Sequence, residues 1–130
     1  AAKESGWGTS RFARDGNALF GQWTYDNNNG LLPLGREEGE KHLIKSFPSL
    51  RESVKSYMRN INSHRAYSSF RKTRSEFREN NMKMNYFKLV DGLKPYAESP
   101  NYTDIIKKII ETNKLYLYDD VTLINKGSLV

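Results

Sequence analysis

The sequence predicts a mainly α (α+β) fold, in which a helical body carries a small β-hairpin lobe. Two patterns predict it. Apolar residues recur with helical spacing over most of the chain after residue 49, and a short alternating stretch falls within residues 31–47. The length of 130 residues is close to the common size of one domain, and a hydrophobic fraction of 37% allows a modest core. We therefore expect one domain, residues 1–117, followed by a C-terminal tail, residues 118–130.

The first 30 residues are punctuated by glycine and asparagine, so only short helical pieces are expected there, around Ala1–Ser5 and Ser10–Arg14. Both tryptophans of the protein, Trp7 and Trp23, lie in this stretch. A glycine-punctuated segment with large aromatic rings more often lines a cleft than builds a core. This segment is therefore where a binding groove is expected.

A small hairpin is predicted next. Leu31–Leu34 forms one apolar arm, His42–Phe47 alternates as the other, and the polar segment Gly35–Glu40 supplies the turn. Proline cannot donate a ladder hydrogen bond, so Pro33 limits the first arm to an edge of the sheet.

Helices are predicted over the rest of the chain. Ser49 and Glu52 have the spacing of a capping box, which opens a helix whose apolar positions recur as far as Ile61. Glycine at position 92 is expected to stop the third helix, and Ser99-Pro100 opens the last. The later helices are predicted over residues 68–79, 84–91 and 99–117. Residues 118–130 lack a clear pattern and are expected to form a tail or a short strand pair.

The net charge of +6 is concentrated in the middle of the chain. Residues 51–94 carry eleven basic and four acidic residues, whereas residues 1–50 carry six of each. A central basic block favours an anionic partner, such as nucleic acid, a membrane surface or an anionic cell-wall polymer; a solvated helical face is an equally good interpretation. No helix-turn-helix, RRM or KH signature is present, so nucleic acid is not the expected partner.

Composition also excludes several kinds of chemistry. The chain has no cysteine, which removes disulfides, thiolate catalysis and most structural zinc sites. Its only histidines are His42 and His64, and no carboxylate cluster accompanies them, so neither a metal nor a cofactor is expected. No apolar run approaches the roughly 20 residues of a transmembrane helix.

Two motifs carry a family resemblance. The first is Glu4-Ser-Gly-Trp-Gly-Thr-Ser-Arg-Phe-Ala13 followed by Asn17-Ala-Leu-Phe-Gly-Gln-Trp23, and the second is the stretch from Tyr57 to Arg74, with Tyr67 at its centre. Together they resemble the bacterial glucosaminidases that cleave peptidoglycan (the endo-β-N-acetylglucosaminidase-like domain), and most closely the Bax-type subgroup. The resemblance covers about residues 1–117. It implies a lysozyme-like architecture, in which the helical body and the β lobe flank a sugar-binding groove.

The resemblance implies that Glu4 is the general acid. Glycoside hydrolysis needs a carboxylic acid that stays protonated near neutral pH, and an apolar setting provides this by disfavouring the charged form. Trp7 and Phe20 are expected to supply that setting, with Trp7 buried beside the carboxyl group.

The second catalytic group is left open between two routes. A carboxylate of the β lobe is one candidate, which means Glu37, Glu38 or Glu40, with Asp26 also within reach in sequence. The other is a substrate-assisted route, in which the acetamido oxygen of the sugar attacks and Tyr67 orients it. A solvated hairpin carboxylate and a core tyrosine are the plain alternatives for these residues.

The groove is expected to be shaped by residues from the first motif. A backbone without a Cβ lets a sugar ring approach closely, which is the role predicted for Gly21, while tryptophan rings stack on sugar faces. The predicted substrate-binding residues are Trp7, Asn17, Phe20, Gly21, Gln22 and Trp23.

The function that the sequence predicts is hydrolysis of the β-1,4 linkage that follows N-acetylglucosamine in peptidoglycan strands, in the periplasm, cell envelope or medium. Arg59, Arg71 and Arg74 would favour anionic wall polymers, and the protein is expected to be a monomer. The family's catalytic glutamate ends a full helix, yet only Ala1-Ala-Lys precede Glu4, so an N-terminal helical segment is expected to be missing. The alternative function is an inactive module that binds the cell wall or another polyanion.

Overall fold

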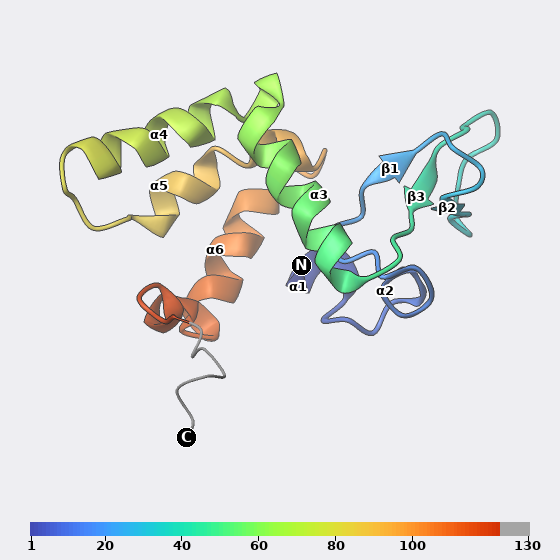
Figure 1. The fold of residues 1–130 in the computed structure, drawn as a ribbon, viewed down its shortest axis with the longest axis horizontal. Helices are drawn as coiled ribbons and strands as arrows, with labels where there is room; N and C mark the ends of the chain where they lie inside the picture. Colours follow the sequence, from blue (N-terminus) through green and yellow to red (C-terminus); the bar gives the residue numbers. More distant parts are fainter. Residues whose placement is uncertain (123–130) are drawn as a thin grey trace. The chain divides into compact units, whose positions relative to one another are not determined.

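The structure, a computed structural model, describes residues 1–122 (Figure 1). It has two compact units, which divide after Arg65. Helices dominate both, and one small antiparallel sheet lies in the first unit, so the predicted mainly α (α+β) class is confirmed. None of the helices in residues 1–122 is long and apolar enough to cross a membrane.

The first unit begins with two short helices, α1 (Ala2–Ser5) and α2 (Arg11–Gly16), close to the predicted pieces. The hydroxyl of Ser10 caps α2 by accepting a hydrogen bond from the Ala13 amide at 3.1 Å. Since neither helix is long enough to be stable alone, both depend on the packing of the segments around them.

The sheet has three short strands in the order β1-β3-β2, and its register pairs Trp23 with Ile44 and Gly30 with Lys45. The strands are β1 (Trp23–Thr24), β2 (Gly30–Leu31) and β3 (Leu43–Lys45). The two predicted arms do pair, but the pairing stops at Leu31, two residues before Pro33. Strand β1 was not predicted, because two residues are too few to show an alternating pattern.

Helix α3 (Leu50–Ser63) completes the first unit. The Ser49 hydroxyl accepts from the Glu52 amide at 3.3 Å, so half of the predicted capping box is present, while the Glu52 carboxylate pairs with Lys55 at 3.0 Å. The most deeply buried residue of this helix is Ser53, which is 0% exposed. Three of the apolar positions that recur with helical spacing, Leu50, Val54 and Met58, are instead exposed.

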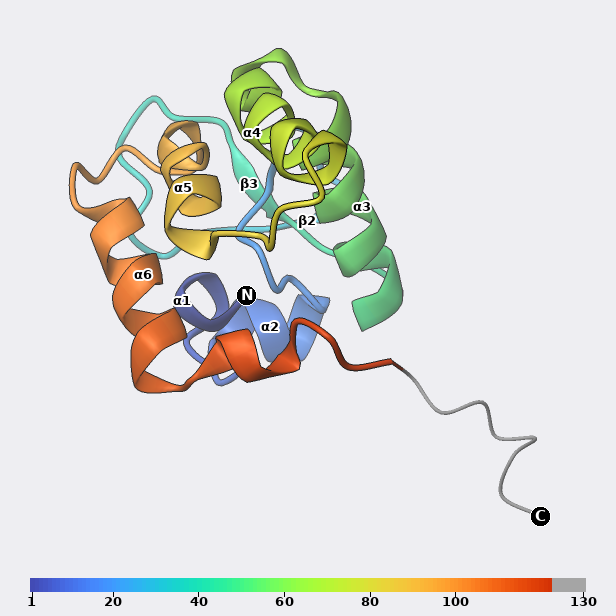
Figure 2. The same cartoon turned by 90° about the vertical axis from the view of Figure 1, so that its left-hand side faces the viewer.

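The second unit is entirely helical among its described residues. Helix α5 lies between α4 and α6 (Figures 1 and 2), and Phe77, Val90 and Tyr102 are buried. Its elements, with the 3₁₀ turn that leads into it, are η1 (Arg65–Tyr67), α4 (Ser68–Glu79), α5 (Tyr86–Asp91), η2 (Lys94–Tyr96), α6 (Tyr102–Thr112) and η3 (Leu115–Tyr118). The predicted helix over residues 68–79 is confirmed to the residue.

The last helix is shorter than predicted. It ends at Thr112 rather than Leu117, because Lys114 takes a left-handed conformation with φ of 50° and the chain continues as a 3₁₀ turn. Of the predicted tail or strand pair, residues 123–130 lie outside the described part of the chain.

Gly92 ends α5 for a reason other than the predicted one. Its φ is −70°, so it is not a left-handed cap. A Cβ at this position would lie 2.6 Å from the Phe70 Cα, so glycine is needed to let the end of α5 approach the backbone of α4.

We expect Gly92→Ala to lower the free energy of unfolding by about 1–3 kcal/mol, because the two helices must separate to admit the methyl group. Gly35→Ala is the matched control, since a Cβ at Gly35 meets nothing within 4 Å. Urea unfolding followed by far-UV circular dichroism measures both. Equal midpoints for the two variants would show that α4 and α5 do not need this close approach.

Candidate functional site

Glu4, the predicted acid, lies near the end of α1. Its side chain is half-buried, and its Oε1 atom is fully buried with no hydrogen-bond partner among the described residues. Leaving a buried acceptor unpaired costs about 1–3 kcal/mol, and such groups are rare enough to require a specific explanation. The next residue, Ser5, is 2% exposed, so the end of α1 is firmly embedded in the first unit.

The chain leaves Glu4 through an unusual turn. Gly6, Trp7 and Gly8 all have positive φ, of 56°, 58° and 81°, and the Gly8 amide donates to the Ser5 hydroxyl at 2.9 Å. For the tryptophan this conformation costs about 1–2 kcal/mol. The predicted burial of Trp7 is wrong, since the side chain is 63% exposed. Backbone hydrogen bonds within this turn, from the Trp7 amide to the Ala2 carbonyl and from the Thr9 amide to the Gly6 carbonyl, hold the conformation in which the ring is exposed.

Asn17 has a structural contact that the sequence did not predict. It ends α2 in the left-handed region with φ of 53°, and its Nδ2 donates to the Phe47 carbonyl at 2.9 Å. The Phe47 amide in turn donates to the Gly16 carbonyl at 2.8 Å. The amide expected to shape the groove floor therefore joins the end of α2 to the segment that follows β3.

The segment after Asn17 is attached to helix α3. The Leu19 amide donates to the buried hydroxyl of Ser53 at 3.2 Å, and the Phe20 ring stacks on Tyr57 with centroids 4.1 Å apart and planes 7° from parallel. Phe20 is buried. The role of Ser53 as a buried acceptor was not predicted. Its only signal in the sequence is a serine among the apolar residues of an amphipathic helix.

Gly21 brings this segment to the carboxyl group of Glu4. Its φ is +60°, and a Cβ at this position would lie 3.5 Å from Glu4 Oε2. The next side chain, Gln22, also has a buried oxygen, Oε1, without a hydrogen-bond partner among residues 1–122. The structure thus brings together two members of the first motif, and it leaves two buried acceptors in it unpaired.

Trp23 lies at the start of β1. One face of its indole ring is covered by His42, with ring centroids 3.9 Å apart and planes 12° from parallel, yet the side chain is 57% exposed. The sheet therefore presents an aromatic surface rather than burying it.

The carboxylates predicted as the second catalytic group lie in three different settings. Glu37 and Glu38 are exposed in the turn between β2 and β3, where their carboxylates form no hydrogen bond or ion pair within the described chain. Glu40, also exposed, lies 3.8 Å from Nδ1 of His42. Asp26 accepts from Asn29 Nδ2 at 2.6 Å and from the Asn28 amide at 2.9 Å. These hydrogen bonds lower the pKa of the Asp26 carboxyl group, mainly through Asn29.

Tyr67 belongs to the second unit. It is 5% exposed, and its ring lies against Tyr96 with centroids 6.3 Å apart; Tyr96 in turn stacks on Tyr102. The plain alternative of a core tyrosine describes this environment well, and its role in catalysis stays a prediction.

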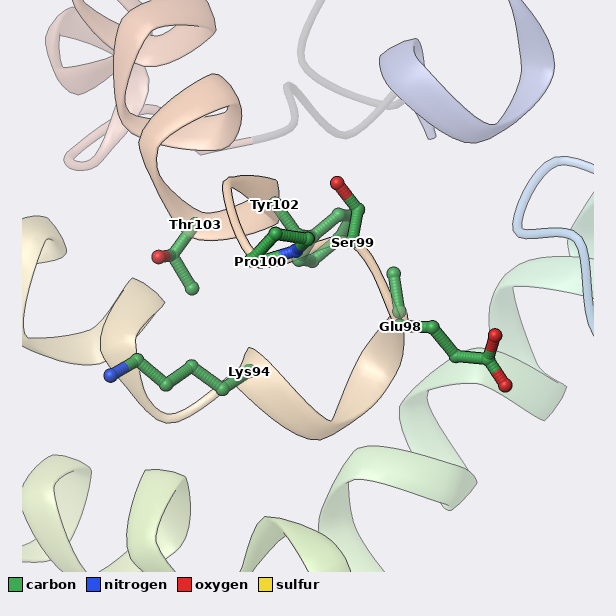
Figure 3. A pocket seen from close by; sticks show the side chains of 7 residues that line it. Lys94, Glu98, Ser99, Pro100, Tyr102 and Thr103 are labelled. Carbon is green, nitrogen blue, oxygen red and sulfur yellow. The ribbon is translucent and has the colours of Figure 1, made fainter.

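A cavity of about 260 Å³ also occurs in the second unit. Figure 3 shows Lys94 and Thr103 extending on the same side, while the carboxylate of Glu98 points the other way. Within residues 1–122, no group of three or more His, Cys, Asp and Glu residues is placed to hold a metal ion.

Comparison with known proteins agrees with the resemblance in the two motifs. Residues 1–115 match the family model described as mannosyl-glycoprotein endo-beta-N-acetylglucosaminidase. The chain belongs to this glucosaminidase family. It is 36% identical over 115 residues to the protein Bax of Escherichia coli K12, a match that covers 88% of this chain and 40% of Bax. No solved structure matches the chain significantly.

The Asn17 hydrogen bond yields a stability prediction for this glucosaminidase domain. We expect Asn17→Ala to lower the free energy of unfolding by about 2 kcal/mol, because it loses both the hydrogen bond to Phe47 and a residue that tolerates positive φ. Asn17→Gly keeps the backbone freedom and loses the hydrogen bond only, so it should cost less than about 1 kcal/mol. Urea unfolding followed by tryptophan fluorescence reports on this unit, which contains both tryptophans. If the two variants lose equal stability, the backbone conformation at Asn17 contributes nothing.

Proposed function

We propose that this chain hydrolyses the β-1,4 linkage that follows N-acetylglucosamine in peptidoglycan, outside the cytoplasm, with Glu4 as the general acid. Membership of a glucosaminidase family supports a glycoside hydrolase that acts on a glycan. The chain spans 40% of the length of its relative Bax, so the substrate and the linkage are part of the proposal.

The observation that carries the proposal is the carboxyl group of Glu4, whose Oε2 lies on the side of Gly21 and whose buried Oε1 has no hydrogen-bond partner among residues 1–122. A structural carboxylate at a helix end is normally paired or solvated, and leaving its oxygen buried without a donor gains no stability. A general acid, in contrast, must present an oxygen to the glycosidic oxygen of a substrate, and Oε2, on the side of Gly21, is the oxygen proposed to do so. The site therefore has the property expected of a group that acts on a ligand.

The surroundings of Glu4 suit a sugar. The absence of a side chain at Gly21 lets a pyranose ring approach the carboxyl group of Glu4. Trp7 and Trp23 present exposed ring surface on which sugar faces can stack. Two contacts hold the segment around Gly21 in place. Phe20 stacks on Tyr57, and Asn17 donates a hydrogen bond to the Phe47 carbonyl.

For the second step we favour the substrate-assisted route. Glu4 transfers its proton to the glycosidic oxygen as the bond from that oxygen to C1 breaks, and the acetamido oxygen of the same sugar forms a new bond to C1. Water then attacks C1 of the resulting oxazolinium ion, the bond from C1 to the acetamido oxygen breaks, and Glu4 takes a proton from that water. The exposure of Glu37 and Glu38 supports this choice, since neither is held in position by a contact within residues 1–122. Tyr67 is the candidate for orienting the acetamido group.

Glu4→Gln should lower the rate of peptidoglycan hydrolysis by at least about 100-fold, because the amide cannot donate the proton while the shape of the side chain is kept. Mass analysis should find N-acetylglucosamine at the new reducing ends after digestion with the parent chain, and no such ends after digestion with the variant. Equal release by parent and variant would remove Glu4 from the mechanism. No release by either, with binding to the wall retained, would leave a wall-binding module.

Substitutions distinguish the two routes to the second step. On the substrate-assisted route, Glu37→Gln and Glu38→Gln should each keep kcat within about threefold, a change of less than 1 kcal/mol in the barrier. Tyr67→Phe should lower kcat about 10-fold or more while the melting temperature, measured in parallel, stays close to that of the parent. A loss of 100-fold or more in either glutamate variant would instead identify a carboxylate of the β lobe as the second group.

A further inference from the structure

A cavity of about 440 Å³ lies in the first unit, and its lining includes Thr24, the neighbour of Trp23 in β1. Its volume is in the range of small-molecule sites. Strand β1, the end of β3 with the segment that follows it, and one face of α3 line it. Its lining includes one hydroxyl and five charged side chains: Thr24, Asp26, Lys45, Glu52, Lys55 and Arg59.

The charges in this cavity are not balanced. The carboxylate of Glu52 is bound by Lys55 at 3.0 Å, so these two residues neutralise each other. The Asp26 carboxylate accepts hydrogen bonds from Asn28 and Asn29, and the nearby charge of Lys45 also lowers its pKa, so Asp26 offsets part of that charge. Lys45 and Arg59, by contrast, form no ion pair with any residue in the described part of the chain. One ammonium and one guanidinium group are therefore available to an anionic ligand.

Lys45 is held in place at the edge of the cavity. Its backbone amide donates to the Gln22 carbonyl at 2.7 Å, and its ammonium group lies over the Phe47 ring, 5.3 Å from the centroid. The hydrogen bond joins Lys45 to Gln22, the neighbour of Gly21, where a Cβ would lie 3.5 Å from Glu4 Oε2. Lys45 is thus attached to the segment that passes the proposed reaction centre.

We propose that this cavity binds a carboxylate of the acidic peptide stems that branch from a peptidoglycan strand, while the strand itself lies at Glu4. The inference rests on the proposed function. Arginine binds a carboxylate through two parallel hydrogen bonds, and the ammonium of Lys45 adds a second charge. The remaining lining also fits a peptide, because the Thr24 hydroxyl can form a hydrogen bond with a peptide group. Asp26 and Glu52 would repel the dense negative charge of a polyphosphate, which disfavours a phosphate polymer.

The test measures binding rather than turnover. The Glu4→Gln chain is titrated calorimetrically with three ligands: a soluble disaccharide–peptide fragment of peptidoglycan, the same disaccharide lacking its peptide, and a glycerol phosphate oligomer that represents a phosphate polymer. Replacing both Lys45 and Arg59 by Met should weaken binding of the peptide-bearing fragment about 10-fold and leave binding of the bare disaccharide unchanged. Lys45→Arg combined with Arg59→Lys keeps both charges and should retain most of the affinity.

The matched control is the pair Lys41→Met and Arg51→Met. It removes the same residue types and the same total charge from exposed positions that do not line the cavity, so any general electrostatic attraction changes equally in both double variants. We expect the control to bind both fragments like the parent. Circular dichroism melting verifies that both double variants are folded.

Four outcomes would overturn the inference: equal loss for both fragments, no loss for either, no binding of the peptide-bearing fragment by the parent, or a loss confined to a glycerol phosphate oligomer. The last would assign the cavity to a phosphate polymer. Because the readout is binding, the failures are distinguishable. Suppose that the unsubstituted chain hydrolyses no peptidoglycan, but that replacing Lys45 and Arg59 weakens binding of the peptide-bearing fragment. The proposed function then fails and this binding site stands.

Discussion

The hydrogen bond from the Leu19 amide to the buried hydroxyl of Ser53 is the interaction on which the candidate site depends. Residues 17–22 follow no regular secondary structure, so their backbone groups have no ladder or helix partners and must be satisfied by other groups. Ser53 provides one such partner, Asn17 supplies another link through Phe47, and the Phe20 ring is fixed on Tyr57. Together these contacts hold an irregular segment in one conformation, and that conformation brings Gly21 to Glu4.

The first motif, residues 4–23, concentrates features that oppose stability. Glu4 and Gln22 each bury an oxygen that has no hydrogen-bond partner among residues 1–122, and Trp7 adopts a left-handed conformation while its ring stays exposed. Proteins violate local rules of this kind mainly where function requires it, and neighbouring contacts offset the cost. In this chain the neighbouring contacts are the hydrogen bonds at the two ends of α2 and the hydrogen bond from Leu19 to Ser53 of α3.

Charge is distributed differently from what the central basic block indicates. In that block Lys55 pairs with Glu52, Lys72 approaches Glu76 at 4.0 Å, and the Arg74 guanidinium lies over Phe70. Much of the block therefore resembles the solvated helical face that was the plain alternative. The cavity beside β3 instead combines Arg59 from the block with Lys45 from a stretch whose net charge is zero. A site for an anion arises where two elements meet, rather than where basic residues are densest along the chain.

The sequence by itself determined the local structure and the family. Helix α4 and the Ser49 cap follow from side chains within a few residues of one another, and the motif at Glu4 identifies the glucosaminidase family because each of its residues must occur in order. Contacts between residues far apart decided the rest. The inward position of Ser53, the outward ring of Trp7 and the need for glycine at position 92 each arise from an approach to another segment. Periodicity reports which side of a helix is apolar, but burial depends on what packs against that side, and only the tertiary structure contains that information.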